Sequence, residues 1–250
     1  FVQDAVKHRA VAVMGEGWGE LSVPFISVPN ARQALADISA AFFDFPSRKL
    51  ELIGITGTNG KTTTSYLLES ILKIDGRIVG VIGTTGARVG ITSFPTHLTT
   101  PESFDLQKIL WQMTSLGVQS VVMEVSSHAL QLERVRGCEF TGGIFTNLTH
   151  DHLDFHENME NYFLAKERLF TEHVDWSRPN AFASINGDDP FGRRLAENIS
   201  SRRLVVYSKE KERASISGKI LKTDAAGMLL ELKLPEKSCQ IQTPLLGEMN

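Results

Sequence analysis

The run from Lys49 to Ile74 constrains the fold of this chain more than any other stretch. Apolar residues mark a short extended segment up to Ile55, and a turn rich in Gly, Thr and Asn follows. After Lys61, apolar residues recur at helical spacing. The pattern predicts a strand, a loop and a helix in direct succession.

The loop in this unit has the chemistry of a phosphate site. Its backbone N–H groups would converge at a helix N-terminus, where the helix dipole and the unpaired donors favour an anion. Gly57 and Gly60 allow the tight turn, Lys61 supplies a cation, and the Thr62 hydroxyl can ligand Mg²⁺. We expect a triphosphate here, although the usual first glycine is replaced by Ile55.

Composition excludes several function classes. A net charge of −3 over 250 residues gives no electrostatic reason to expect nucleic acid. Cys138 and Cys239 form no CxxC pair, so neither a disulfide framework nor a zinc site is expected. No apolar run approaches the ~20 residues of a membrane span, and the N-terminus lacks a signal-peptide layout. We expect a cytoplasmic protein without membrane insertion.

Strand and helix patterns alternate from residue 49 onward. This alternation predicts an α/β fold with a doubly wound, mostly parallel sheet and ligands at the carboxyl ends of its strands. Past residue 207, glycines and a proline split alternating segments, which predicts antiparallel edge strands. The expected strands are 50–55, 78–82, 120–125, 140–146, 181–185 and 204–207, and the expected helices are 61–74, 102–116, 159–170 and 191–198.

We divide the chain at residue 45. Residues 1–45 are expected to be the end of a preceding small α/β domain, and residues 46–250 a second domain that contains the predicted phosphate loop. The chain lacks an initiating Met and stops abruptly, so we expect an excerpt of a longer protein.

A short helix is predicted over residues 31–43. Asn30 can cap it, and Ala34, Leu35 and Ile38 share an apolar face. Pro46 would end the helix and open a linker to the next domain.

Two further stretches, one at a strand end and one at a helix start, carry polar residues. Glu124 follows a buried strand pattern, at a position typical of a Mg²⁺ ligand, although an ordinary loop residue would look the same. The run Thr99-Thr100-Pro101-Glu102 predicts a helix start with a Thr cap, Pro at the first helical position and Glu in the first turn. Such a helix start can also bind a substrate anion.

The segment from His150 to His156 holds three of the chain's seven histidines and two aspartates. It contains no HExxH motif, so a magnesium site fits better than a zinc site, and a solvated polar loop stays open. Lys166, on a helix beside Glu167, is by composition alone a surface lysine.

As an ordered set, these motifs resemble the Mur ligases, and within that family the MurE enzymes of peptidoglycan synthesis. The modified phosphate loop is itself the Mur form. The resemblance is dense from about residue 50 to 170 and weaker to residue 250. It implies that residues 1–45 are the C-terminal part of the family's UDP-binding N-terminal domain, that residues 46–250 are the central ATP-binding domain, and that the C-terminal domain, which binds the amino acid, is absent here. It rests on the runs 56–63 (TGTNGKTT), 99–102 (TTPE), 123–130 (MEVSSHAL), 145–156 (FTNLTHDHLDFH) and 162–170 (YFLAKERLF).

The resemblance implies a set of site residues, of which Lys61, Glu124, His152 and Lys166 would be catalytic. Thr62 and Glu124 would serve one Mg²⁺ and His152 a second. Lys166 would react with CO₂ to form a carbamate that also serves the metal. ATP would be held by Gly57, Thr58, Asn59, Gly60, Lys61, Thr62 and Thr63. The UDP-N-acetylmuramoyl-dipeptide would contact Thr99, Thr100, Ser126 and Arg134.

The implied reaction is ATP-dependent amide formation. ATP would phosphorylate the γ-carboxylate of the D-Glu residue, and the amine of a diamino acid would attack the acyl phosphate. The sequence leaves open meso-diaminopimelate, which we favour, and L-lysine. We expect a monomer, and we expect the excerpt alone to be inactive because the amine site lies in the missing domain.

Three other interpretations compete with this one. Another Mur ligase or a folylpolyglutamate synthase would share much of the pattern. A non-catalytic nucleotide-binding scaffold would predict loss of the four catalytic residues, all of which are present. A GTPase is disfavoured because the DxxG match at 189–192 has no accompanying NKxD.

Overall fold

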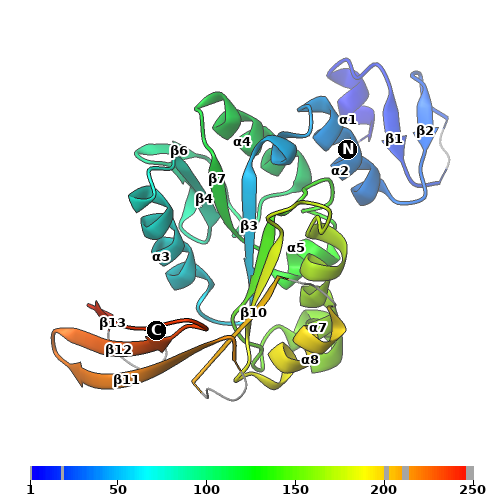
Figure 1. Ribbon diagram of the computed structural model, residues 1–250. Helices are drawn as coiled ribbons and strands as arrows, with labels where there is room; N and C mark the ends of the chain where they lie inside the picture. The colour runs from blue at the N-terminus through cyan, green and yellow to red at the C-terminus, as the bar shows by residue number, and fades with distance from the viewer. Residues whose placement is uncertain (1, 18–19, 200–202, 210–213, 246–250) are drawn as a thin grey trace.

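Within the described residues, eleven strands form one sheet through the middle of the molecule (Figure 1). The computed structural model describes residues 2–17, 20–199, 203–209 and 214–245. The strand order is β13-β12-β11-β10-β9-β8-β3-β7-β4-β5-β6. The strands are β3 (Glu51–Thr56), β4 (Val79–Gly83), β5 (Gly86–Val89), β6 (Thr92–Phe94), β7 (Ser120–Glu124), β8 (Gly142–Phe145), β9 (Phe182–Asn186), β10 (Leu204–Ser208), β11 (Ile216–Asp224), β12 (Gly227–Lys233) and β13 (Ser238–Thr243).

The strands from β11 to β4 pair in parallel, and antiparallel pairs extend the sheet at both edges. The predicted α/β fold with a mostly parallel sheet is therefore confirmed, as are antiparallel strands after β10. Both sides of the sheet carry helices. They are α3 (Lys61–Ile74), α4 (Ser103–Ser115), α5 (Ser127–Gln131), α6 (Leu153–His156), α7 (Met159–Arg168) and α8 (Pro190–Asn198).

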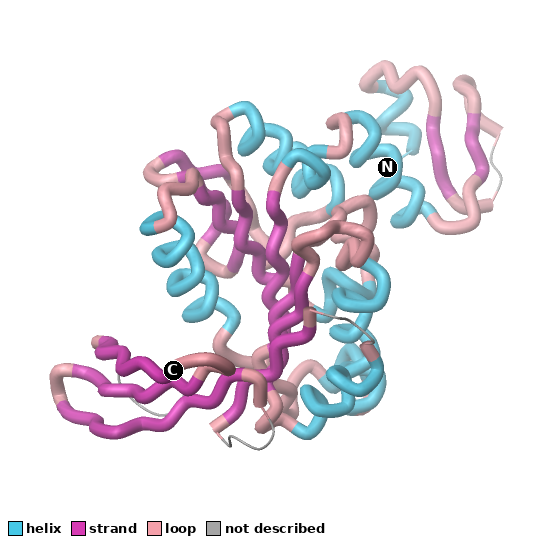
Figure 2. The backbone as a smooth tube through the Cα atoms, in the orientation of Figure 1, coloured by secondary structure: helices cyan, strands magenta, loops and turns pink. Residues whose placement is uncertain are grey.

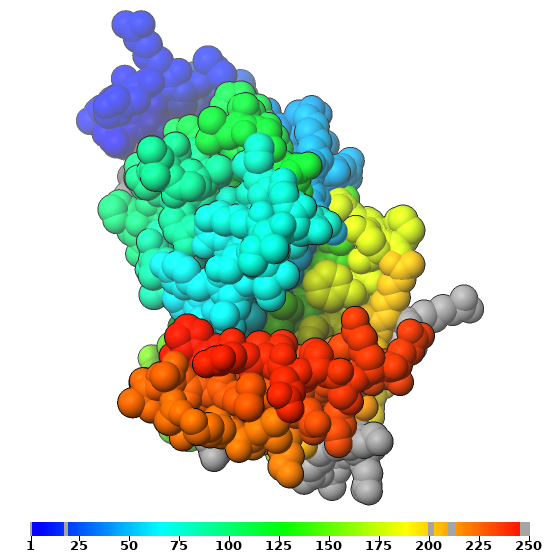
Figure 3. Space-filling model, turned by 60° about the vertical axis from the view of Figure 1, so that its left-hand side comes forward, coloured from blue at the N-terminus to red at the C-terminus, as the bar shows by residue number. Residues whose placement is uncertain are grey.

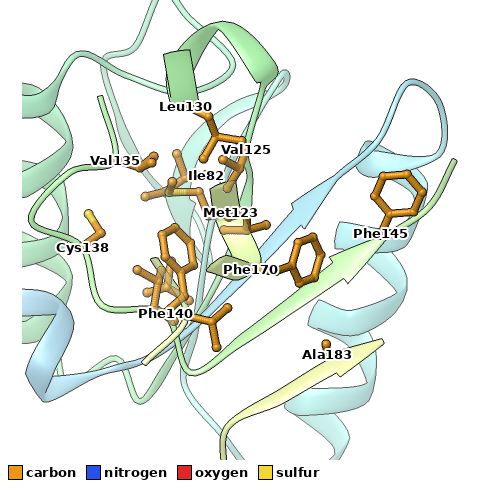
Figure 4. Packing of buried hydrophobic residues seen from close by; sticks show 14 of the residues in the cluster. Ile82, Met123, Val125, Leu130, Val135, Cys138, Phe140, Phe145, Phe170 and Ala183 are labelled. Carbon is orange, nitrogen blue, oxygen red and sulfur yellow. The ribbon is translucent and has the colours of Figure 1, made fainter. Parts of the chain in front are cut away.

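The two faces of the sheet are buried in separate apolar clusters. On one face, Ile55, Val79 and Val122 pack against Leu68 and Leu72 of α3. The other face builds a larger core from the strands together with α4 and α7, part of which is drawn in Figure 4. Burial on both faces explains why the central strands are apolar almost throughout.

Residues before β3 form a small unit at one end of the molecule (Figure 2). Two short strands pair in parallel there, β1 (Val13–Gly15) and β2 (Phe25–Ser27), beside the helices α1 (Val2–Lys7) and α2 (Ala31–Phe42). The expected linker is an ordered 3₁₀ turn, η1 (Pro46–Lys49), in which Pro46 and Ser47 are buried. The division of the chain at residue 45 stays a prediction.

Helix α2 starts at its predicted cap, because the Asn30 side chain accepts a hydrogen bond from the N–H of Gln33. The prediction that the apolar face of this helix is its buried face is wrong. The buried positions are instead Ala36, Ser39 and Ala40, where small side chains let α2 approach α4 closely, and Leu35 and Ile38 are exposed.

Several elements were absent from the sequence prediction, among them the short helices α5 and α6. Strands β5 and β6 form an antiparallel edge beyond β4. Helix α1 precedes β1, and the predicted helix 159–170 ends in a π-helical turn, Leu169–His173. At the opposite edge, Figure 3 shows β11 to β13 below the body of the molecule and far from the N-terminal unit. No helix among the described residues is long and apolar enough to cross a membrane.

A buried ion pair ties α3 to the edge strand β5. Glu69 is 4% exposed and accepts two hydrogen bonds, of 2.6 and 2.7 Å, from Arg88. We expect Arg88→Ala to lower the free energy of unfolding by about 2 to 3 kcal/mol at pH 7, because Lys73 alone then faces the buried carboxylate. Lys73→Ala, which removes the more exposed partner, is the control and should cost less than about 1 kcal/mol.

The cost of Arg88→Ala should depend on pH. Arg88 holds the pKa of Glu69 below its usual value of 4.5, mainly through its hydrogen bonds. A depressed carboxyl pKa stabilises the fold above the usual pKa, and this stabilisation is lost as the pH falls through the folded-state value. Urea unfolding measured from pH 7 to pH 3 should therefore show that the difference in unfolding free energy between the wild type and Arg88→Ala shrinks as the pH falls. A constant difference would contradict this assignment.

Candidate functional site

The carboxyl ends of β3, β4, β7 and β8 meet at one edge of the sheet, and the loop from β3 to α3 lies there. Gly60 is the N-cap of α3, with φ of 84°. The loop is tied to the segment after β8. The N–H of Thr58 donates to the Asn147 carbonyl at 2.9 Å, and the N–H of Asn59 donates to the Asn147 side chain at 2.9 Å. The predicted phosphate loop is thus an ordered turn at a helix N-terminus.

Gly57 is required by geometry. Its φ is 147°, and a Cβ built on it would lie 1.9 Å from Oγ1 of Thr146. We expect Gly57→Ala to cost about 3 kcal/mol or more in unfolding free energy, and to weaken nucleotide binding at least about tenfold. Gly76→Ala is the matched control. Gly76 also has positive φ, of 81°, but has open space beside it. Thermal unfolding should show a larger loss of stability for Gly57→Ala than for Gly76→Ala. Equal losses would show that the clash with Thr146 does not contribute.

Lys61 lies over the loop. Its Nζ donates to the carbonyls of Gly57 and Thr58, at 2.9 and 2.8 Å. Burial lowers the pKa of Lys61, and the charges of Glu124 and Asp151 partly offset this. A lysine folded onto its own loop in this way can turn outward to an anion without moving the backbone. Thr63 follows in the first turn of α3, half-buried.

Thr62 and Glu124 meet as predicted. Oγ1 of Thr62 donates to Oε1 of Glu124 at 3.0 Å. Glu124 is 1% exposed, and Thr84, at the end of β4, donates to its two carboxylate oxygens from its N–H and its hydroxyl. These donors are all neutral. A buried carboxylate beside a hydroxyl is the donor set that a hard cation such as Mg²⁺ prefers, so these residues fit the predicted metal.

Lys166 is not a surface residue, which corrects the interpretation from composition. It is 1% exposed, and its Nζ donates to the Gly57 carbonyl at 3.0 Å. Burial lowers the pKa of Lys166 well below its usual range, and the charge of Lys61 lowers it further. An uncharged lysine amine can act as a nucleophile. A buried amine with a lowered pKa therefore lies beside the predicted phosphate loop.

The histidine-rich segment becomes a ring cluster. The ring of His152 lies 4.9 Å from that of His128 and 6.0 Å from that of Tyr162, between centroids. His156 is buried and stacks on Tyr162 at 5.0 Å. The described residues contain no group of three His, Cys, Asp or Glu side chains that could hold a metal alone. The role of His152 at a second metal therefore stays a prediction.

The four residues predicted to contact the dipeptide lie together beside Glu124. Thr100 is fully buried, donates to the Glu124 carbonyl at 2.9 Å and accepts from the N–H of Ser126 at 3.1 Å. Arg134 donates to the Thr100 carbonyl at 3.3 Å. The Thr99 hydroxyl is 3.3 Å from that of Thr84. The buried Thr100 holds this group together, and Thr99, Ser126 and Arg134 keep exposed surface.

The predicted Thr cap at residues 99–102 is wrong. The N-cap of α4 is Glu102, whose side chain makes no capping hydrogen bond, and Pro101 precedes the helix. Thr100 has its hydroxyl bonded to β7 and to Ser126 instead. The DxxG match has a structural role: Asp189 caps α8 and accepts from the N–H of Leu148 at 2.9 Å.

Comparison with known families adds to this geometry. Residues 55–250 match the family model described as the Mur ligase middle domain. The chain belongs to the Mur ligase family. The family model begins at the last residues of β3 and so includes the whole phosphate loop of this Mur ligase.

Two curated relatives of this chain have the same name. A UDP-N-acetylmuramoyl-L-alanyl-D-glutamate–2,6-diaminopimelate ligase of Geobacillus thermodenitrificans is 40% identical over 253 residues, which cover 100% of this chain and 51% of the relative. A ligase of the same name from Geobacter metallireducens is 48% identical over 193 residues, or 76% of this chain and 38% of the relative. The chain spans about half the length of the curated relatives it matches.

A solved structure of a ligase of that name superposes on this Mur ligase chain with a TM-score of 0.87 and 29% identity. The superposition covers 99% of this chain and 50% of the solved one. The shared fold therefore extends over nearly the whole chain, including the small N-terminal unit.

Sequence reasoning missed several residues around the site of this Mur ligase. Thr84 holds the Glu124 carboxylate, Asn147 supports the loop, and Tyr162 lies beside Lys166. Thr84 could have been proposed as a site residue because it lies at the end of a strand, as Glu124 does. Tyr162 precedes Lys166 by one helical turn, and spacing alone does not show that its ring faces the site.

Proposed function

We propose that the protein containing this chain is a MurE-type ligase. It would form an amide between UDP-N-acetylmuramoyl-L-alanyl-D-glutamate and a diamino acid, with conversion of ATP to ADP and phosphate. The observation that supports this most is the buried Lys166 at the phosphate loop, 3.0 Å from the Gly57 carbonyl, in a chain of the Mur ligase family. A scaffold would have no use for a buried amine that costs free energy to desolvate.

ATP would lie on the loop of residues 57–63, with its phosphates at the N-terminus of α3. Lys61 would leave the Gly57 and Thr58 carbonyls and turn to the outer phosphates. Thr62 and Glu124 would hold Mg²⁺, which neutralises charge on the transferring phosphoryl group. His152 would serve a second ion.

Lys166 would act as a carbamate. Its amine, when uncharged, attacks CO₂ to form a new N–C bond, and the released proton leaves an anionic carboxylate on Nζ. This converts a cation into an anion that would help to hold the metal. The low pKa of Lys166 and its fixed position favour this step.

Thr99, Ser126 and Arg134 would bind the muramoyl-dipeptide, with Thr100 fixing their positions. The D-Glu carboxylate would attack the γ-phosphorus of ATP and yield an acyl phosphate and ADP. The amine would then displace phosphate and form the amide bond. We favour meso-diaminopimelate as the amine donor, because relatives at 40% identity are named for it.

The test is phosphate release by the full-length protein with Mg²⁺-ATP and the UDP-muramoyl-dipeptide, with meso-diaminopimelate or L-lysine in separate reactions. We expect release that depends on the dipeptide and on diaminopimelate. Release with L-lysine but not with diaminopimelate would identify L-lysine as the amino acid that is added. Release only when folate substrates replace the dipeptide would indicate a folylpolyglutamate synthase. Nucleotide binding without release in any reaction would contradict the proposal.

A further inference from the structure

Two lysines, Lys61 and Lys166, donate to the same carbonyl oxygen of the phosphate loop. The Gly57 carbonyl accepts from Nζ of Lys61 at 2.9 Å and from Nζ of Lys166 at 3.0 Å. A second contact adds to these bonds: Nζ of Lys166 lies over the ring of Tyr162, 4.5 Å from the ring centroid.

Tyr162 is held on three sides. It is 1% exposed, and its ring stacks on His156 with centroids 5.0 Å apart and an interplanar angle of 30°. His156 in turn hydrogen-bonds Ser127 through Nε2 at 2.9 Å. The Tyr162 hydroxyl reaches Oγ1 of Thr58 at 3.3 Å, inside the phosphate loop. One side chain thus contacts both the loop and the reactive lysine.

We propose that Tyr162 is a positioning residue with two separable parts: its ring protects the Lys166 carbamate, and its hydroxyl fixes the phosphate loop through Thr58. The inference rests on the proposed function, since it assumes a nucleotide on the loop and a carbamate on Lys166.

The ring acts by filling the space beside Nζ. A carbamate decomposes when water delivers a proton to its nitrogen, so a side chain that excludes water there prolongs its lifetime. The face of the ring also attracts an ammonium group, which opposes the carbamate. The two effects have opposite signs. Because Lys166 is almost completely buried, water exclusion dominates the lifetime, and loss of the ring speeds the breakdown of the carbamate.

The hydroxyl acts on the loop. Oγ1 of Thr58 also accepts from the N–H of Thr149 at 3.0 Å, so Thr58 joins the loop to the 146–152 segment and to α7. Without the Tyr162 hydroxyl, Thr58 is still connected to the 146–152 segment but no longer to α7. The loop then has more conformations to lose when phosphate binds, and the nucleotide affinity falls.

The ring is tested by ¹³C NMR of protein labelled in ¹³C-bicarbonate and then moved to unlabelled bicarbonate, without nucleotide or muramoyl substrate. Lys166→Arg shows the background signal, because a guanidinium forms no carbamate. We expect Tyr162→Phe to lose the ¹³C label at the wild-type rate and Tyr162→Leu to lose it several-fold faster. An unchanged or slower loss of label in Tyr162→Leu would overturn the role of the ring. If Tyr162→Leu does not fold, Tyr162→Met, which fills more of the space, replaces it.

The hydroxyl is tested by ADP titration calorimetry. We expect Tyr162→Phe to weaken ADP binding about threefold to tenfold, the loss of one hydrogen bond. Thr58→Val should weaken it at least as much, and the double variant should bind no worse than Thr58→Val. Additive losses, or wild-type affinity in Tyr162→Phe, would overturn the role of the hydroxyl.

Neither measurement uses the muramoyl-dipeptide or the amino acid. A failed ligation assay would therefore refute the proposed function and leave the loop part of the inference standing. A wild-type protein without any carbamate signal would refute the role of the ring, and the ADP titrations would still decide the role of the hydroxyl.

Discussion

Lys166→Met is expected to lower kcat for amide formation by roughly a thousandfold or more, the largest loss at any single position of this site. The substitution keeps the length of the side chain and removes the amine that would become the carbamate. Lys166→Arg should be as inactive, because it restores a positive charge but no carbamate. Lys108→Met, at an exposed position of α4, is the control and should retain full activity.

The same substitution should not destabilise the fold. Lys166 is 1% exposed, and burial opposes its charge, so an apolar side chain of similar volume fits the site at least as well. We expect the Tm of Lys166→Met to equal or exceed that of the wild type. A lower Tm together with lost activity would mean that Lys166 serves the structure. An Arg variant with near wild-type kcat would refute the carbamate.

Glu124→Gln is expected to lower kcat by about 10²- to 10³-fold and to raise the Mg²⁺ concentration needed for half-maximal activity. The amide keeps the shape of the carboxylate and removes its charge. The amide NH₂ group would face either the Thr84 hydroxyl, which donates to Oε2, or the Thr62 hydroxyl and the Thr84 N–H, which both donate to Oε1. In either placement at least one of these donors would lose its acceptor.

Activity measured against Mg²⁺ concentration checks the role of Glu124. Glu231→Gln, on the edge strand β12, is the matched control and should leave the curve unchanged. A Glu124→Gln enzyme with the wild-type magnesium dependence would place the metal elsewhere. Unchanged ADP binding without magnesium would show that the loop itself is intact.

Much of the site could be predicted because its signals are local. The phosphate loop is a run of consecutive residues, and its conformation follows from Gly57, Gly60 and the helix that starts at Lys61. Glu124 is the last residue of the buried strand β7, and parallel strands bring such ends together. These features need only the order of the elements and the rules of parallel sheets.

What could not be predicted depends on contacts between distant segments. The sequence around Lys166 has the composition of an ordinary surface helix. Only the packing of α7 against the loop buries this lysine. Thr100 precedes a proline at a helix start, yet its hydroxyl is used by β7. The exposed Leu35 and Ile38 show the same limit, since small residues on α2 pack better against α4 than large ones do.

The central claim, that this site activates a carboxylate by phosphorylating it, can be tested by isotope transfer. The full-length protein would be given the UDP-muramoyl-dipeptide with ¹⁸O in the D-Glu γ-carboxylate, together with Mg²⁺-ATP and meso-diaminopimelate. If an acyl phosphate forms, each phosphate released carries one ¹⁸O from the substrate, and mass spectrometry detects it. Phosphate without ¹⁸O, released in step with amide formation, would contradict the mechanism.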